Sequence, residues 1–548
     1  MAVDSSYVVY GAIIVLAYLT LQHVLERKRT PKGYRPIPRV PGWPIVGNTF
    51  QLGKHPQKTT IKWAKQYGEI YELNVRGMRI VMFGTREAIK DVFERQSAVT
   101  SSRMPLPAMN EVISGGFRML MMPYGQKWRQ LRAIVHKTTT PKASDAVRPS
   151  QEFESKQLAF DILTNNEDSK SFYDHTRRYT TSVMMTVTYG KRMPTSNHED
   201  IKQVYKAMGE MGQLVLPRGF LVDSFPVLAK LPMWMQTWRK KAKEYYYGQE
   251  KIWTRLYGGL LKELDNGTAP DCFVKQIAEE ETQRRGISDV QAAFVAGSVI
   301  EAGSETTAGL LNSIWKYVAA NPRVQAAAHE ELSRVVGEGR SPTFSDMENL
   351  PYISAITKEV LRFRPVAAFA LVHSTTGDVV YKDYFIPNGT TIGYSMVATH
   401  FDDTYEDPFE FRPERHLGST VRFGTSLTNP DTKKRVTYAF GSGRRMCPGV
   451  HLAENSLFIV AARILWAFEL KPALDEHGQE ILVDVSDEAY IHASIVVPKS
   501  YSLRFVPRSP QREKVVRDEW KSAEVDGYWL GNIKVDKNGM LSKESQKV

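Results

Sequence analysis

The chain has 548 residues, of which 42% are apolar, a formal net charge of +12 and only two cysteines, Cys272 and Cys447. Two widely separated thiols exclude a disulfide framework and any zinc or iron–sulfur site built from several thiolates. The basic residues are spread along the sequence rather than blocked, so the positive charge favours an anionic membrane surface or an acidic protein partner over nucleic acid. Any thiol chemistry must therefore use a single sulfur.

The first predicted element is a membrane-spanning helix. Residues 7–25 carry no Asp, Glu, Lys or Arg, and about nineteen such residues can cross the hydrocarbon core. Basic residues follow at 26–30, whereas the leading MAVDSS has none, so we expect the body of the protein to face the cytosol. A cleaved signal peptide would need a basic start, a shorter apolar core and a small-residue cleavage site, which are missing. We assign residues 1–30 to a membrane anchor.

A proline-rich hinge is predicted at residues 31–48. Prolines at positions 36, 38, 41 and 44 fix φ and remove amide donors, so this stretch is neither helix nor central strand. It is either a stiff spacer or an ordinary linker. Residues 49–507 are expected to form one folded domain, and residues 508–548 a charged tail without periodicity.

Within the domain, the patterns are mainly helical, with a smaller strand-rich part. Pro322 and Pro351 each stand at the first turn of an expected helix, and these helices end near Gly337 and before Pro365. Strand signals concentrate in residues 377–395, where β-branched and aromatic residues surround an Asn-Gly pair. The sequence therefore predicts a mainly α fold with small β-sheets.

One long helix is expected to be buried. Residues 290–315 are apolar or small except for Glu301 and Glu305, so most faces of this helix must contact the core. Ser288 and Gln291 can form its capping box. A buried carboxylate needs a partner or a purpose, and two interpretations of Glu301 stay open: it contacts a substrate hydroxyl or amine, or it pairs with a neighbouring helix.

The stretch FGSGRRMCPG at residues 440–449 is the most specific motif. It matches F-x-x-G-x-R-x-C-x-G in full, and with cysteine this rare a chance match is roughly one in ten thousand. Glycine turns that aim amides at a sulfur lower its charge density, and a flanking cation can bind an acidic group of the same cofactor. The loop indicates a thiolate ligand rather than a cysteine buried in a glycine-rich turn.

This loop resembles that of the cytochrome P-450 superfamily of haem-thiolate monooxygenases. The resemblance implies that Cys447 is the proximal ligand of a b-type haem iron, that Arg445 contacts a haem propionate and that Phe440 packs near the sulfur. It also implies propionate contacts from three further residues, Trp128, Arg132 and His373. For His373, a loop histidine with its own partner is the other interpretation.

Residues 302–307 look like the oxygen-activation motif of this family. The resemblance implies that Gly303 lets the backbone approach dioxygen, and that Glu305 and Thr306 relay protons to it as the catalytic pair. The other interpretation is that the hydroxyl groups only bond the backbone of their own helix.

The resemblance also implies a structural charge cluster and substrate-facing segments. Glu359, Arg362 and Arg415 would form a buried ionic triad beneath the haem, with His416 where many relatives carry an aromatic residue. The segments implied to face the substrate are residues 101–117, 212–235, 365–370 and 490–496.

The implied function is oxidation of a small to medium apolar or aromatic substrate. The fungal-like, microsomal character implies a single-pass anchor in the endoplasmic reticulum membrane, a cytosolic catalytic domain, electrons from NADPH through a membrane-bound reductase, and a role in secondary metabolism. The alternatives are a haem-thiolate isomerase or dehydratase that needs no reductase, a hydroxylase of xenobiotics or primary metabolites, and a haem carrier or sensor.

Overall fold

The computed structural model describes residues 30–43, 46–165, 169–215, 219–281, 286–419, 421–492, 495–531 and 533–539. The anchor predicted at residues 1–30 therefore lies almost wholly outside the described residues. Within them, one helix, Val450–Ala467, is long and apolar enough to cross a membrane, but 89% of it is buried inside the protein. The chain divides into two compact units, which we describe separately.

The first unit contains the chain up to Met104 together with Phe369–Thr399 and Ser442–Arg445. Its centre is a four-stranded sheet of order β1-β2-β6-β3, in which only the β2–β6 pair is parallel. The strands are β1 (Ile70–Val75), β2 (Met78–Phe83), β3 (His373–Ser374) and β6 (Thr391–Tyr394), and a separate hairpin pairs β4 (Val379–Tyr381) with β5 (Tyr384–Ile386). The helices are α2 (Pro56–Tyr67), α3 (Arg86–Ile89), η1 (Lys90–Arg95), α4 (Ser97–Thr100), α17 (Met396–His400) and η9 (Gly443–Arg445).

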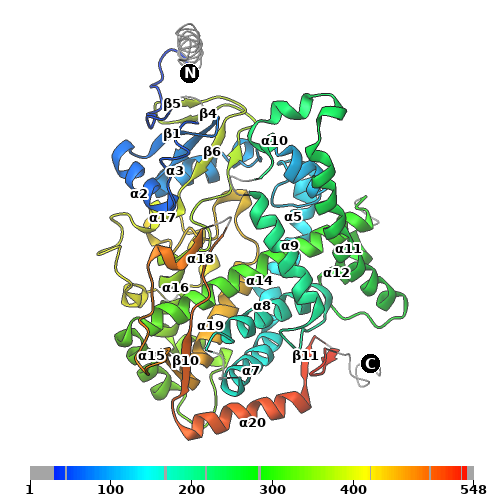
Figure 1. Ribbon diagram of the computed structural model, residues 1–548, viewed down its shortest axis with the longest axis vertical. Coiled ribbons are helices and arrows are strands. Elements are labelled where there is room, and N and C mark those ends of the chain that lie inside the picture. The colour runs from blue at the N-terminus through cyan, green and yellow to red at the C-terminus, as the bar shows by residue number, and fades with distance from the viewer. Residues whose placement is uncertain are drawn as a thin grey trace, which may run out of the picture. The chain divides into compact units, whose positions relative to one another are not determined.

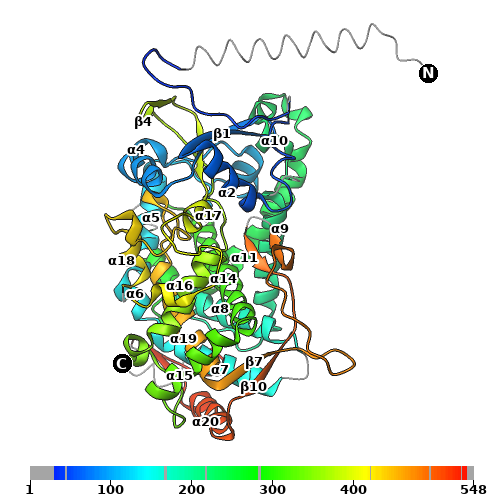
Figure 2. The same cartoon turned by 90° about the vertical axis from the view of Figure 1, so that its left-hand side faces the viewer.

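The first unit packs its helix α2 against the sheet. Trp63 of α2 lies in one apolar cluster with Tyr71 and Leu73 of β1, and Figure 2 shows the helix beside this strand. The hinge runs along the same strand: the Val40 amide donates to Glu72 O (N···O 3.0 Å), and the Glu72 amide donates to Pro38 O (2.8 Å). The hinge prolines lack amide donors, so it adds isolated bridges rather than a strand.

The second unit is mainly helical. Its longer helices are α5 (Gln126–Thr139), α7 (Arg148–Thr164), α8 (Phe172–Tyr189), α9 (Glu199–Val215), α11 (Trp238–Asp265), α14 (Asp289–Ala319), α15 (Pro322–Val335), α16 (Pro351–Phe363), α19 (Val450–Ala467) and α20 (Pro510–Asp526). Its short helical segments are η2 (Pro107–Ile113), α6 (Pro141–Asp145), α10 (Leu221–Ser224), η3 (Pro226–Lys230), η4 (Met233–Met235), α12 (Phe273–Gln276), η5 (Ile277–Glu281), η6 (Phe344–Asn349), η7 (Pro413–His416), α18 (Phe423–Leu427), η8 (Thr432–Lys434) and η10 (Asp487–Ala489). Its strands form three pairs: β7 (Phe468–Pro472) with β10 (Leu503–Pro507), β8 (Tyr490–His492) with β9 (Val496–Pro498), and β11 (Tyr528–Leu530) with β12 (Ile533–Val535).

Helix α14 forms the core of this unit and contacts α8, α11 and α19. Figure 1 shows it running through the middle of these helices. Leu311, Ile314 and Trp315 are fully buried in one cluster with Trp466 of α19. The predicted buried helix is thus confirmed. Ser288 caps it by accepting the Gln291 amide.

The predicted helix starts and strand region are confirmed. Pro322 and Pro351 occupy the first turn of α15 and α16, and three strands lie within residues 377–395. The Asn-Gly turn does not close a hairpin, because β5 pairs with β4, whereas β6 joins β2 and β3.

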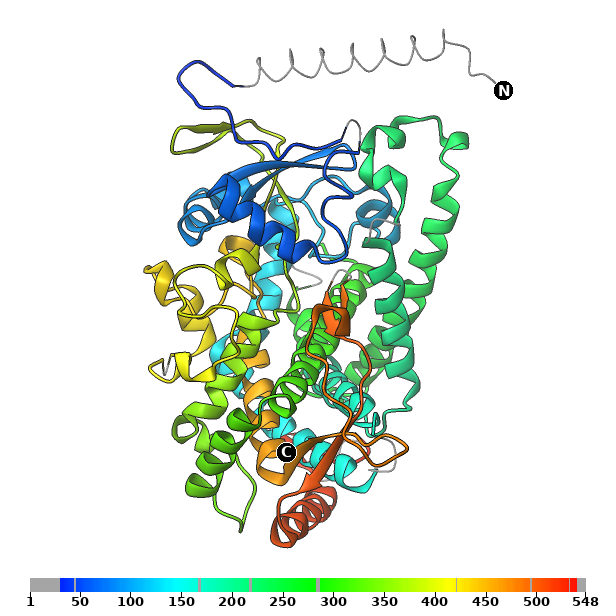
Figure 3. The ribbon, with the colours of Figure 1, turned by 60° about the vertical axis from the view of Figure 1, so that its left-hand side comes forward.

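The C-terminal region differs from the charged tail expected at residues 508–548. Pro510–Asp526 forms α20, and a hairpin of β11 and β12 follows. Trp520 of α20 and Tyr528 of β11 both pack on Phe153 of α7, with ring centroids 5.3 and 4.9 Å apart. Figure 3 shows α20, the orange-red helix at the bottom of the view, at one end of the second unit. Many exposed charges surround these few apolar contacts, so the sequence shows no strong periodicity.

Candidate functional site

Cys447 lies in a tight loop that leads into α19. Its amide donates to Phe440 O (N···O 2.8 Å), which closes the loop. Burial raises the pKa of the Cys447 thiol, whereas a hydrogen bond from the Gly449 backbone and the charge of Arg132 act in the opposite direction. The Phe440 ring packs on Phe423 of α18, with centroids 5.8 Å apart. The sulfur therefore has an amide and a guanidinium that would favour its thiolate form beside a metal cation.

Helix α5 contacts the cysteine loop directly. Arg132 Nη2 donates to Met446 O at 2.5 Å, one residue before the cysteine. Trp128 lies one turn earlier, is buried, and packs on Tyr124 with ring centroids 5.4 Å apart. Sequence reasoning had assigned Arg132 to a propionate, and its contact with the cysteine loop is an additional finding.

The first glycine of the cysteine motif is required by close backbone packing in the first unit. Gly443 has φ +66°, and an added Cβ would lie 2.0 Å from Phe93 O of η1. A side chain at this position would therefore face both backbone strain and a collision. The preceding hydroxyl, Ser442 Oγ, donates to Glu94.

Basic side chains gather in the first unit around His373. Its Nδ1 lies 2.7 Å from Thr100 O, and Arg445 Nε donates to Ser101 O at 2.8 Å. Arg103 donates to the two carbonyl groups that precede His373. Sequence reasoning included Arg103 in the substrate-facing segment 101–117 but did not single it out, because no local motif marks it and its partners lie in a distant segment.

His373 is neutral, whereas the neighbouring Arg103 and Arg445 are cations. Burial and the charges of Arg103 and Arg445 hold the pKa of His373 well below its usual range. Because the Thr100 carbonyl can only accept, the neutral imidazole carries its proton on Nδ1, and Nε2 is an acceptor. His373 of β3 therefore has a backbone partner of its own, and its propionate contact stays a prediction. Burial lowers the pKa of Arg103 only to about 10, so it remains a cation.

The oxygen-activation segment exposes one stripe of an otherwise buried helix. Ala302 is exposed and Thr306 is half-buried on α14, and Thr306 Oγ1 donates to Ala302 O at 2.7 Å. This bond is the backbone bond of the alternative interpretation. Gly303 also packs closely against α8, where an added Cβ would lie 2.3 Å from Met184 Sδ. Its expected role toward dioxygen stays a prediction.

Glu305 has a cationic partner on α8. Arg177 Nη2 lies 3.4 Å from Glu305 Oε1, and the Arg177 guanidinium also lies over the rings of Tyr173 and Tyr205, at 5.1 and 4.7 Å. Glu305 remains partly accessible, with 19% of its side chain exposed, so protons from solvent can reach it.

Glu301 is buried in a separate ion pair. Arg118 Nη2 lies 2.9 Å from Glu301 Oε1, Arg118 Nη1 binds the other carboxylate oxygen, and Arg118 Nη2 also donates to Gln249 Oε1 at 2.6 Å. Of the two interpretations left open for Glu301, contact with a substrate or pairing with a neighbouring helix, the structure shows a pairing, with a loop arginine whose guanidinium also binds Gln249 of α11. Sequence reasoning found neither, because they lie far from Glu301 in the chain.

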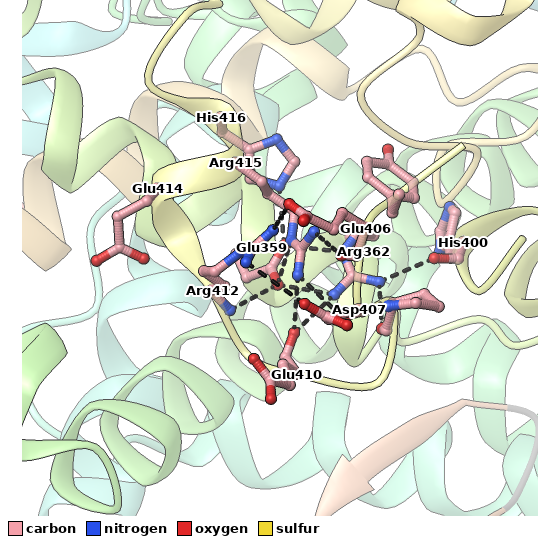
Figure 4. A network of polar contacts seen from close by, with 12 residues as sticks. Glu359, Arg362, His400, Glu406, Asp407, Glu410, Arg412, Glu414, Arg415 and His416 are labelled. Carbon is pink, nitrogen blue, oxygen red and sulfur yellow. Dashed lines mark hydrogen bonds and ion pairs between the residues drawn. The ribbon is translucent and has the colours of Figure 1, made fainter. Parts of the chain in front are cut away.

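The predicted ionic triad is present and has a fourth member (Figure 4). Glu359 accepts from Arg362 Nη2 (2.7 Å), Arg415 Nε (3.1 Å) and His416 Nε2 (2.9 Å). Burial alone would raise the pKa of Glu359, but Arg362 and His416 hold it at about 2. Arg362 also donates to three backbone carbonyl groups, those of His400, Pro408 and Glu410.

Residues 38–486 match the family model described as Cytochrome P450. The chain belongs to the cytochrome P-450 family. Family membership implies a haem with a cysteine thiolate ligand, and the family's named relatives are monooxygenases.

Its relatives include fungal P-450 monooxygenases. The chain is 39% identical to cytochrome P450 monooxygenase pgmC of Aspergillus terreus, over 96% of both chains. It is 37% identical to cytochrome P450 monooxygenase verL of Clonostachys rogersoniana, over 89% of this chain and 90% of the relative. It is 34% identical to cytochrome P450 monooxygenase fogE of Aspergillus ruber, over the same shares. The protein is therefore a P-450 monooxygenase of fungal type.

Proposed function

We propose that this monooxygenase hydroxylates, or otherwise oxidises, a small to medium apolar or aromatic substrate in fungal secondary metabolism. The observation that carries this proposal is that the second unit contains both Cys447 and α14, on which Ala302 is exposed and Thr306 is half-buried. Electrons would come from NADPH through a membrane-bound reductase. The relatives' fungal origin supports the place in fungal metabolism, and the apolar residues of the segments implied to face the substrate support the substrate class.

The residues present fit a haem. Cys447 of the second unit offers one sulfur with a backbone donor and a nearby guanidinium. In the first unit, the buried Arg103 and the half-buried Arg445 are cations that would suit propionates. His373 would need to gain a proton before its Nε2 could donate to a propionate. When bound, haem supplies the activation of dioxygen and the oxidation of a C–H bond, and a thiolate ligand favours O–O cleavage.

The chain itself supplies protons and position. The Thr306 hydroxyl would turn away from Ala302 O and towards the side of α14 where dioxygen would react. There it would donate the proton on Oγ1 to the reacting oxygen. Glu305 would return a proton from solvent, because its carboxylate is partly accessible beside Arg177. Such general acid–base groups typically contribute 10²–10⁴-fold to rate.

Residues 1–30 would anchor the protein as a single-pass helix in the endoplasmic reticulum membrane, and residues 31–48 would connect it to a cytosolic catalytic domain that begins at residue 49. A reductase with an acidic docking face would suit the net charge of +12. The folded region up to residue 539 extends this domain beyond residue 507.

The test is turnover in membranes that contain the chain with or without a fungal reductase. A panel of apolar and aromatic compounds is first screened for a substrate-induced spectral shift, and each hit is incubated with NADPH under ¹⁸O₂. We expect a product with one ¹⁸O atom that requires both NADPH and reductase. Conversion that needs neither, without ¹⁸O, would instead indicate an isomerase or dehydratase.

A further inference from the structure

The buried ion pair Arg118–Glu301 joins a loop to α14, next to the open stripe that Ala302 and Thr306 form on this helix. Arg118 belongs to residues 114–125, which connect η2 to α5, whereas Glu301 immediately precedes the exposed Ala302 on α14. Gln249 of α11 binds the same guanidinium. Exposed fractions of 8% for Arg118, 9% for Glu301 and 1% for Gln249 place the contact away from solvent. Three separate elements therefore meet at one guanidinium.

This cluster is not arranged for maximum stability. Within the part of the chain that the structure describes, Arg118 Nε and Gln249 Nε2 are buried without a hydrogen-bond partner, and unsatisfied buried donors are unfavourable. Well-packed apolar residues can replace a buried ion pair with little or no loss of stability. A bidentate ion pair, however, fixes orientation in a way that apolar contacts do not. Its distinctive contribution is geometric.

The loop needs such a fixed point. Gly115 and Gly116 have φ of +55° and +71°, so two left-handed residues separate η2 from residues 117–125 of the loop. Helix η2 is held by Asp223 of α10, whose carboxylate accepts the Ala108 and Met109 amides. Residues 117–125 depend on other contacts.

Contacts near Arg118 hold residues 117–125 of the loop on α14. Phe117 packs on Phe294 of α14, with ring centroids 5.7 Å apart, and Tyr246 of α11 stacks on the same Phe294 at 5.5 Å. Ring contacts are less directional than a bidentate ion pair, so the two bonds between Arg118 and Glu301 define the register. The position of the loop along α14 therefore follows from the ion pair.

We propose that Glu301 and Arg118 are positioning residues that clamp the loop 114–125 onto α14 and thereby determine which ligand shapes reach the open stripe at Ala302. This inference rests on the proposed function, in which Ala302 and Thr306 face the reacting oxygen. It gives Glu301 a role in specificity without contact to the substrate.

The decisive variant replaces both charges. Arg118→Met together with Glu301→Leu keeps the volume and removes the charges, so the holoenzyme should fold and keep its haem. Glu301→Gln is the single variant. As a matched control, Glu154→Gln breaks another buried Arg–Glu contact, between α7 and Arg178 of α8, outside the loop.

Two probes report on the clamp without turnover. Spectral titrations with imidazole and with the bulkier 4-phenylimidazole give a ratio of dissociation constants, and hydrogen exchange measures residues 114–125 in the holoenzyme. We expect the ratio to change by about fivefold or more in the double variant and in Glu301→Gln, with faster exchange of the loop. Glu154→Gln should keep the wild-type ratio in the protein that retains haem.

An unchanged ratio and unchanged loop exchange in the double variant would overturn the clamp. An equal change in Glu154→Gln would also overturn it, because general destabilisation would then explain the effect. Neither probe requires a reductase or oxygen, so their results are independent of whether the proposed hydroxylation is correct.

Discussion

Two hydroxyl groups on α14 make the same bond in different surroundings. Thr306 Oγ1 donates to Ala302 O at 2.7 Å on the open stripe, and Ser304 Oγ donates to Ile300 O at 2.8 Å in the buried core. Of these two hydroxyl groups, only that of the half-buried Thr306 can exchange its backbone partner for reacting oxygen, because Ser304 is buried in the core. The two positions therefore separate a role in proton delivery from a role in the helix.

Thr306→Ala should fold and bind haem, because a methyl group replaces a small hydroxyl. Product per NADPH consumed should fall by at least about tenfold, the low side of general acid–base contributions, and hydrogen peroxide should accumulate. Both quantities are measured in the reconstituted system with any substrate that is turned over. Ser304→Ala is the control and should stay coupled. Full coupling in Thr306→Ala would show that another group delivers the protons.

Single residues were predictable from sequence where the contacts are local. Cys447 and Phe440 lie seven residues apart, and the closing bond of their loop is part of the motif. Arg103 and Arg118 could not be found in this way, since the groups they bind lie about 270 and 180 positions along the chain and no local pattern records such a pairing.

At the level of elements, charge holds irregular segments on helices. The carboxylate of Glu359 in α16 pairs with Arg415 and His416 of η7. One fully buried carboxylate therefore fixes η7, which precedes the cysteine loop in the chain. The spacing of Glu359 and Arg362 indicated the pair. The contact of His416 with the same carboxylate was not predictable, because a histidine at that position could equally have faced solvent.

Glu359→Gln should destabilise the fold by about 3–5 kcal/mol, the usual cost of breaking a buried charged set, and reduce haem retention. The lowered pKa gives a sign for pH: the Glu359 carboxylate stabilises the folded state above its ordinary pKa of 4.5, and this contribution is lost as the pH falls towards about 2. Thermal unfolding and haem content at several pH values measure both effects.

Glu414→Gln is the matched control, since its carboxylate is 31% exposed and pairs with the exposed Arg323. Such a surface pair contributes about 0–1 kcal/mol, so unfolding should change little. Equal destabilisation by both variants would contradict the special role of Glu359.

A second carboxylate connects η2 to α10. Burial, opposed by the two amide bonds from Ala108 and Met109, raises the pKa of Asp223 from 3.8 to about 6. A raised acid pKa means that the folded state binds the proton more tightly, so stability from this group is fully present below about 3.8 and is lost as the pH rises through 6.

We therefore expect the melting temperature of the wild type, relative to Asp223→Asn, to increase as the pH falls from 7 towards 5. The measurement is differential scanning calorimetry of both holoproteins in matched buffers. A difference that stays constant, or that shrinks on acidification, would contradict the raised pKa.

For the whole molecule, sequence patterns predicted the mainly helical class and the cysteine loop but not the division of the chain. Residues 369–399 and 442–445 join the N-terminal segment in the first unit, and such long-range pairing leaves no periodic signal. The helix α20 was missed for a related reason. Its apolar contacts, Val515, Val516, Trp520 and Ala523, are few and lie among exposed charges.

Trp520→Ala should cost about 3–5 kcal/mol, as large-to-small core substitutions of Trp do, because its ring is 7% exposed against α7. Trp529→Ala is the control. Trp529 lies in β11, the next element, and is 49% exposed, so this variant should unfold like the wild type. Denaturant unfolding of the holoprotein compares them. Wild-type stability of Trp520→Ala would contradict a structural role for α20 and support the charged tail predicted from the sequence.

The measurement that tests haem-thiolate chemistry most directly is the absorption spectrum of the ferrous carbon monoxide complex. With Cys447 as the axial thiolate, the purified protein should show the strongly red-shifted Soret band of a thiolate haem. Cys447→Ser should abolish that band, whereas Cys272→Ser, which changes the only other cysteine of the chain, should leave it unchanged. Retention of the band in Cys447→Ser would contradict the assignment of the ligand and the mechanism built on it.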